Sequence, residues 1–96
     1  MAVLIFKEEA RADIVNAFSW YEEQSEGLGH TFLRALESVY DILLKHPLIY
    51  QKVYKDFRQA VVKEFPFVVL YAIEKDTIVV LRVFHTRQDP DKRFSG

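Results

Sequence analysis

Two apolar runs in the C-terminal half of the chain constrain its fold most. Residues 67–73 read FVVLYAI and residues 78–84 read IVVLRVF, with the polar link Glu74–Thr77 between them. Runs of this length, rich in Val, Ile, Phe and Tyr, are typical of β-strands, and the polar link favours an antiparallel hairpin. Neither run alternates clearly between polar and apolar residues, which indicates strands covered on both faces, or nearly so.

The first half of the chain has the apolar period of helices. After a short run at residues 2–6, which predicts a first strand, apolar side chains recur on one helical face as far as Tyr21, and a second stripe continues to about His46. Gly27 and Gly29 interrupt the stripes, and we expect them to supply the left-handed backbone found beyond a helix end. Pro47 ends the second helix. These patterns predict an αα-hairpin.

Together the patterns predict one α+β domain over residues 1–96. It consists of an N-terminal strand, the αα-hairpin, and an antiparallel meander of strands at residues 57–64, 67–73 and 78–84 packed on the helices. The hairpin would cover one face of the sheet, and a partner protein or self-association the other. Because the apolar run at residues 2–6 is too short to span a membrane and has no basic leader, we expect a cytoplasmic protein.

Composition excludes several classes of function. The chain has no cysteine, so disulfides, thiolate metal sites and cysteine nucleophiles are excluded. Its three histidines never occur at the i, i+4 spacing of a helical zinc site, and the Gly27–Gly29 segment follows no strand, so we expect neither a metal nor a cofactor. The net charge of −1 means that binding to nucleic acid or membrane would need a local basic patch.

The segment at residues 82–90, RVFHTRQDP, is the main candidate for chemistry. His85 would leave the last strand rigidly placed yet exposed, and imidazole suits general acid or base catalysis near neutral pH. A capping hydrogen bond is the structural alternative for this histidine. Basic side chains that could gather here to bind phosphate or carboxylate are Arg58, Lys63, Arg82 and Arg87. Their structural alternative is pairing with surface carboxylates such as Asp56, Glu64 or Asp89.

Aromatic residues of the predicted hairpin are candidates for the core or for a partner site. We interpret most of them as core, but Trp20 lies off the main stripe, so its indole is predicted to be partly exposed. Exposed aromatic side chains are frequent interface hot spots. The predicted partner-binding residues are Trp20, Tyr21 and Phe32, and the alternative is that Trp20 seals the junction between helix and sheet.

Several short motifs occur in an order that is similar to a known family. They are Trp20-Tyr21-Glu22, Gly27-Leu28-Gly29-x-x-Phe32-Leu33, Arg58-x-Ala60-x-Val62-x-x-Phe65-Pro66-Phe67-x-x-x-Tyr71 and Val83-Phe84-His85-x-Arg87-x-x-Pro90. The sequence thereby resembles the RelE/ParE superfamily of bacterial toxins, often called plasmid-stabilisation proteins. This resemblance implies the fold described above and a toxin that is neutralised by a separately encoded antitoxin. A homodimer, or a heterotetramer with the antitoxin, is compatible with it.

Two targets follow from the resemblance. RelE-like relatives cut messenger RNA on the ribosome without a metal, and ParE-like relatives inhibit DNA gyrase. Just before Tyr71, where RNA-cutting relatives with a C-terminal histidine carry an arginine that would stabilise charge on the scissile phosphate, this chain has Phe67-Val68-Val69-Leu70. We therefore favour a growth-inhibiting toxin that binds DNA gyrase and is not an enzyme. The alternative is a metal-independent, ribosome-associated mRNA endoribonuclease, with His85, Arg58 and Arg87 as its catalytic residues.

Overall fold

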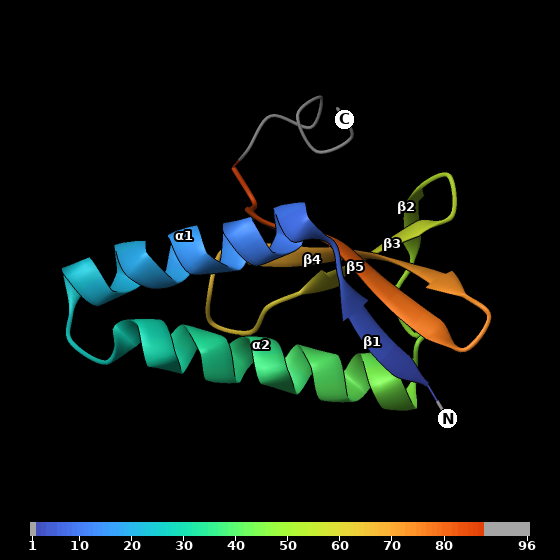
Figure 1. Cartoon of the computed structure of the whole chain (residues 1–96), viewed down its shortest axis with the longest axis horizontal. Coiled ribbons are helices and arrows are strands. Elements are labelled where there is room, and N and C mark those ends of the chain that lie inside the picture. Colours follow the sequence, from blue (N-terminus) through green and yellow to red (C-terminus); the bar gives the residue numbers. More distant parts are fainter. Residues whose placement is uncertain (1, 88–96) are drawn as a thin grey trace.

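A computed structural model describes residues 2–87. These residues form two helices and a five-stranded sheet (Figure 1). In chain order the elements are β1 (Val3–Phe6), α1 (Glu8–Gln24), α2 (Leu28–Lys45), β2 (Lys52–Tyr54), β3 (Phe57–Val61), β4 (Phe67–Glu74) and β5 (Thr77–His85). The predicted α+β class and the αα-hairpin are confirmed. Asp89 and Pro90, which the sequence analysis considered as an ion-pair partner and a motif residue, lie outside the described residues.

The turn between the helices uses its two glycines for different reasons. Gly27 adopts the predicted left-handed backbone, with φ of 86°. The same prediction is wrong for Gly29, which lies inside α2. A Cβ atom at Gly29 would stand 2.7 Å from the carbonyl oxygen of Phe18. Gly29 therefore allows the start of α2 to approach α1 closely, and the two helices lie side by side (Figure 1).

The sheet has the strand order β1-β5-β4-β3-β2. Three neighbouring pairs are antiparallel, and two of them, β3–β4 and β4–β5, were predicted. In contrast, β1 is parallel to β5, with Val3 opposite Thr77 and Phe6 opposite Val80. The sheet is therefore mixed. The predicted antiparallel meander is confirmed, and the sequence had not predicted how the N-terminal strand pairs. The short edge strand β2, whose residues are all exposed, was not predicted because it has no apolar pattern.

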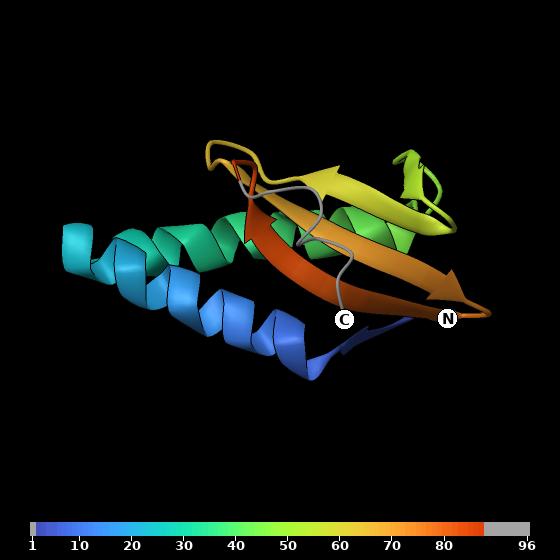
Figure 2. The same cartoon turned by 90° about the horizontal axis from the view of Figure 1, so that it is seen from above.

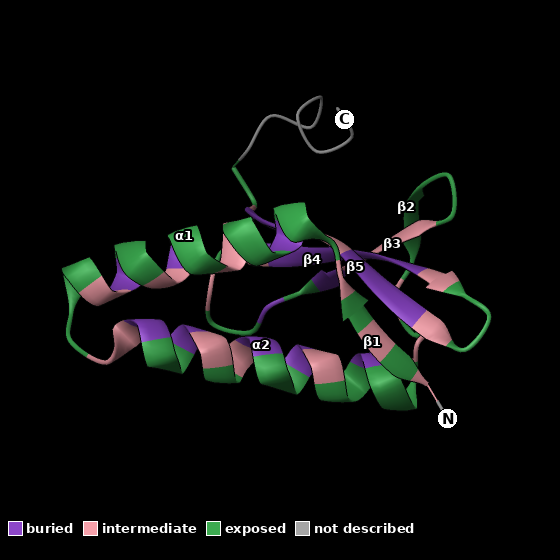
Figure 3. Cartoon of the chain, in the orientation of Figure 1, coloured by how far each residue is buried: buried purple, intermediate pink, exposed green. Residues whose placement is uncertain are grey.

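The helices cover one face of the sheet, as Figures 2 and 3 show together. Phe32, Leu36, Val39 and Leu43 of α2 pack there against side chains such as Tyr71, which is fully buried. Alternate residues of β4 point to the opposite face, where Val68, Leu70 and Phe84 form a smaller buried cluster.

The smaller cluster corrects one expectation about the uncovered face. Val68, Leu70 and Phe84 are at most 3% exposed within the single chain, so the centre of that face does not depend on a partner for its burial. Between residues 2 and 87, neither helix is long and apolar enough to cross a membrane.

Candidate functional site

A hollow of about 420 Å³ lies at the C-terminal end of β5, where the predicted histidine is found. It is lined by Ala17, Trp20, Tyr21, Pro66, Phe67 and His85. The second half of α1 forms one wall, and the start of β4 with the end of β5 forms the other. The two strands of the second wall are joined at this end, because the Thr86 amide donates a hydrogen bond to the carbonyl of Pro66 over 2.8 Å. The structure thus brings His85 and Trp20 to one site.

The three predicted partner-binding side chains differ in accessibility. Trp20 is 57% exposed and stands edge-on against Tyr21, with ring centroids 5.1 Å apart. Tyr21 is only 8% exposed, and burial raises the pKa of its hydroxyl above the ordinary value. Phe32 is fully buried and packs against Phe65 and Phe67. Tyr21 and Phe32 therefore support the position of Trp20 from the core, and Phe32 has no surface to offer to a partner.

His85 is half-buried at the rim of this hollow. Its ring stands edge-on against Phe67, with centroids 5.4 Å apart, and its Nδ1 accepts the backbone N–H of Arg87 over 3.0 Å. An Nδ1 that accepts a hydrogen bond leaves the imidazole proton on Nε2. The capping alternative from the sequence analysis is thus realised at Nδ1, while Nε2 keeps the capacity to donate or exchange a proton.

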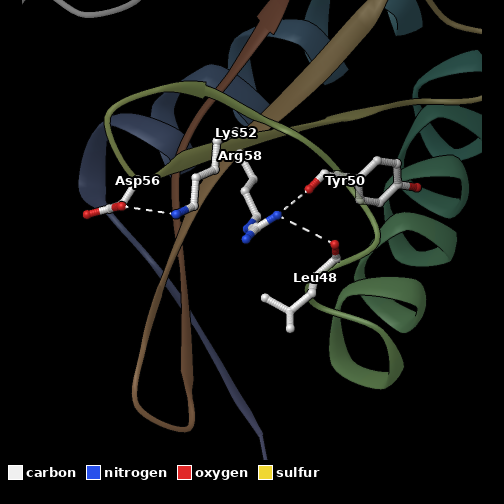
Figure 4. A network of polar contacts seen from close by, with 5 residues as sticks. All are labelled: Leu48, Tyr50, Lys52, Asp56 and Arg58. Carbon is white, nitrogen blue, oxygen red and sulfur yellow. Dashed lines mark hydrogen bonds and ion pairs between the residues drawn. The ribbon is translucent and has the colours of Figure 1, made fainter.

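Arg58 lies in a different part of the structure, at the start of β3. Its Nη1 donates to the backbone carbonyl of Tyr50 over 2.6 Å and to that of Leu48 over 3.5 Å (Figure 4). Next to it, Lys52 forms an ion pair of 3.3 Å with Asp56. The guanidinium is therefore engaged by the segment between α2 and β2, which it holds against the sheet.

The sheet register keeps Arg58 away from His85. Arg58 lies opposite Tyr71 on one side of β4, and His85 lies opposite Phe67 on the other side. Four residues along a strand and two strand spacings across the sheet separate their Cα atoms by about 17 Å. The predicted phosphate clamp that would combine His85, Arg58 and Arg87 is therefore not assembled. Arg87 lies two residues after His85, and its side chain is exposed.

Arg82 and Lys63 do not complete such a cluster either. Arg82 forms a two-pronged ion pair with Asp13 of α1, with distances of 2.7 and 3.0 Å. The same carboxylate accepts the backbone N–H of Val83 over 2.9 Å, beyond the point where β1 ends. Asp13 is therefore a link between helix and sheet, and its hydrogen bonds raise the pKa of Arg82. Lys63 is exposed in the segment that follows β3.

A second hollow, of about 490 Å³, was missed by the sequence analysis. It lies between α2 and β2 and is lined by Lys45, His46, Pro47, Leu48 and Ile49. The available signal was the pair Leu48-Ile49, two large apolar residues that follow a helix-ending proline and belong to no periodic element. Across the part of the chain that the structure describes, no three His, Asp or Glu side chains gather closely enough to hold a metal ion.

The fold is that of bacterial toxins from toxin–antitoxin systems. The isolated Escherichia coli RelE toxin superposes with a TM-score of 0.68 at 16% identity, covering 97% of this chain and 93% of RelE. A chain of the chromosomal ParDE system of Pseudomonas aeruginosa gives 0.67 at 15% identity, covering 88% and 96% respectively. YafQ from E. coli strain BL21(DE3) gives 0.64 at 13% identity, covering 99% and 100%.

Sequence comparison identifies the family within this class. The family model described as "ParE toxin of type II toxin-antitoxin system, parDE" matches residues 4–90. No curated protein sequence gives a significant match. The chain belongs to the ParE toxin family of type II toxin–antitoxin systems, and the predicted RelE/ParE resemblance is confirmed.

Proposed function

We propose that this toxin inhibits growth by binding a macromolecular target, DNA gyrase, rather than by cutting RNA. The observation that carries the proposal is the engagement of Arg58. Its guanidinium is bound to the carbonyls of Tyr50 and Leu48, two strands away from His85. A nuclease without a metal needs positive charge aimed at the scissile phosphate beside its general acid.

The remaining basic side chains support the same interpretation. The charge of Arg82 is compensated by Asp13 at hydrogen-bond distance. The central strand carries Val68, Val69 and Leu70, all buried, where an arginine would be needed for phosphate stabilisation. His85 with Arg87 alone provides one proton-transfer group and one exposed cation. Binding to a protein target needs neither.

We also propose that a cognate antitoxin covers the hollow beside Trp20. A half-exposed indole supported by buried aromatic rings is the type of side chain that carries binding energy in interfaces. The adjoining hollow is lined mainly by apolar side chains and suits the apolar face of an amphipathic segment. Such a segment could occupy this hollow in a complex of one toxin with one antitoxin, or in a heterotetramer of two toxins and two antitoxins.

The target is tested by expressing the full chain without antitoxin and following DNA and RNA in parallel. Gyrase inhibition predicts broken or relaxed chromosomal DNA with intact messenger RNA, and inhibition of supercoiling by purified gyrase. Messenger RNA cut on ribosomes by the wild type, but left intact by a folded His85→Ala variant, would establish the endoribonuclease instead.

The antitoxin site is tested by titrating the cognate antitoxin against Trp20→Ala. We expect affinity to fall by about thirtyfold or more, as for a typical hot spot, with little change in melting temperature. Val61→Ala is the matched control, because Val61 is also largely exposed but lies on β3. Unchanged affinity with a lower melting temperature would show that Trp20 serves the helix–sheet junction.

A further inference from the structure

The segment between α2 and β2 exposes large apolar side chains. Leu48 is 69% exposed and Ile49 is 63% exposed, which makes Leu48 the most exposed large apolar side chain between residues 2 and 87. Both line the hollow next to Pro47. Because these two adjacent aliphatic side chains face water, their apolar surface area does not contribute to the stability of the fold.

The backbone of the same segment is firmly held. The hydroxyl of Tyr71, a fully buried residue, donates to the carbonyl of Pro47 over 2.7 Å. Burial raises the pKa of Tyr71 to about 12, so this hydroxyl stays protonated and continues to donate. Arg58 binds the next carbonyls at Leu48 and Tyr50, and the Ile49 amide donates to the carbonyl of His46 over 3.1 Å. The backbone is thus bound to the core while Leu48 and Ile49 remain outside.

Such an arrangement favours binding. A surface that is already ordered in the free protein loses less conformational entropy when a partner covers it. Apolar side chains at the centre of the surface supply the buried area, and a polar rim supplies orientation and specificity. The segment at residues 46–50 has this apolar centre.

The stretch of chain that contains the segment has more basic than acidic side chains. Residues 44–58 contain four Lys or Arg side chains (Lys45, Lys52, Lys55 and Arg58) and one carboxylate, Asp56. The local excess of three positive charges contrasts with the net charge of −1 of the whole chain. Asp56 is itself paired with Lys52. The complementary surface is therefore apolar at its centre and acidic at its rim.

We propose that residues 46–50, with Lys45 and Arg58 at their rim, form the surface that binds the target of growth inhibition. The target contributes a protein patch of apolar side chains bordered by Asp and Glu. This inference rests on the proposed function and assigns its target to one part of the molecule. A second copy of the chain fits less well, because a symmetric pairing would bring like charges together. A nucleic acid is also a poor partner, because its charged phosphates would face the apolar side chains of Leu48 and Ile49.

The test compares two double variants of the full chain. Leu48→Ala with Ile49→Ala removes the apolar centre, and Val15→Ala with Val61→Ala removes two similarly exposed side chains from α1 and β3 as the matched control. Growth inhibition at equal expression, affinity for purified gyrase holoenzyme, affinity for the antitoxin and melting temperature are measured for each. We expect the first variant to lose at least tenfold in gyrase affinity and to release growth. The control should match the wild type in these two measurements, and neither variant should change melting temperature much.

The outcomes separate the two proposals. If Leu48→Ala with Ile49→Ala inhibits growth as strongly as the wild type, the inference is overturned and the proposed function stands. Antitoxin affinity that falls as far as growth inhibition, or a wild-type dimer that the variant dissociates, also overturns it by giving the surface another occupant. If the wild type stops growth without affecting gyrase, the gyrase assignment fails, and the loss or retention of growth inhibition in the variant still decides the inference.

Discussion

At the helical hairpin, side-chain carboxylates accept backbone N–H groups, whereas at the 46–50 segment side-chain donors bind backbone carbonyls. Asp13 accepts the Val83 amide, and Glu22 accepts the amides of Gly27 and Gly29 over 3.2 and 2.7 Å. Arg58 and Tyr71 donate to three carbonyls of the other segment. Both regions satisfy backbone groups that no helix or strand pairs.

The difference determines what each region can do. At the hairpin, the carboxylate of Asp13 meets a guanidinium and that of Glu22 meets the N-terminus of α2, so their charges are balanced internally. At the 46–50 segment, the guanidinium of Arg58 meets neutral carbonyls, so its positive charge is uncompensated by them. The hairpin is thereby built for stability, and the other region retains charge for a partner.

The largest effect is expected at Asp13. Asp13→Ala leaves Arg82 without its partner and the Val83 amide without its acceptor, which should lower the free energy of unfolding by about 2 to 3 kcal/mol. Denaturant unfolding of both proteins measures this. Glu23→Ala, at an exposed carboxylate of the same helix, is the control and should change stability little. Equal losses in the two variants would contradict the role assigned to Asp13.

Removal of Arg58 should lower the free energy of unfolding by less than removal of Asp13, and its effect should be concentrated in the 46–50 segment. Arg58→Ala deletes the donor to Leu48 and Tyr50, for an expected loss of about 1 to 2 kcal/mol. Hydrogen exchange at the Ile49 amide should become faster, because its segment loses an anchor. Arg58→Lys keeps the charge but replaces the planar guanidinium, and its stability should lie between those of the wild type and Arg58→Ala. An unchanged exchange rate would show that Tyr71 alone holds the segment.

A smaller, pH-dependent effect is expected at Glu22. The backbone N–H of Gly27 makes the largest contribution to lowering the pKa of this carboxylate from its ordinary value of 4.5. Desolvation opposes it, and the backbone N–H of Gly29 lowers the pKa further. Its contribution to stability is therefore present above pH 4.5 and is lost as pH falls through the lowered value. Glu22→Gln should be less stable than the wild type at pH 7 and approach it in acid.

Melting temperature as a function of pH tests this prediction. Glu23→Gln is the control, because it removes a neighbouring charge without a described backbone hydrogen bond. A constant difference between Glu22→Gln and wild type from pH 7 to pH 2 would show that hydrogen bonding to the neutral side chain accounts for the contribution.

The smallest effect is expected at Lys52. Its ion pair with Asp56 joins side chains that are 53% and 90% exposed, and such pairs contribute about 0.5 kcal/mol or less. Lys52→Ala should leave the denaturation midpoint nearly unchanged at 0.15 M salt. A loss as large as that of Arg58→Ala would mean that this pair, and not the guanidinium, organises the segment.

Much of the fold could be predicted from local pattern. The apolar stripe of α2, the end of that helix before Pro47, and the buried runs of β4 and β5 are properties of short sequence windows. The exposure of Trp20 followed from its position off the stripe of α1. The position of β1 beside β5 could not be found this way, since periodicity shows that a segment is a strand but not which strand it joins.

The candidate site was harder to predict because its contacts join distant residues. Asp13 and Arg82 are 69 positions apart, so no local pattern shows that they form an ion pair. Arg58 was grouped with His85 because both are functional residue types near strand ends. Their separation depends on strand order and register, which fix them at different positions along β4. Side-chain chemistry was visible in the sequence, and its spatial grouping was not.

The parallel pairing of β1 with β5 has a consequence for the synthesis of this protein. Val3 is among the first described residues to leave the ribosome, yet its neighbour in the sheet is Thr77. Until β5 has emerged, β1 has no strand to join and Asp13 has no arginine to bind. High contact order of this kind delays folding to a late stage of translation. The nascent toxin therefore cannot complete this domain, or present its finished surfaces, until β5 has left the ribosome.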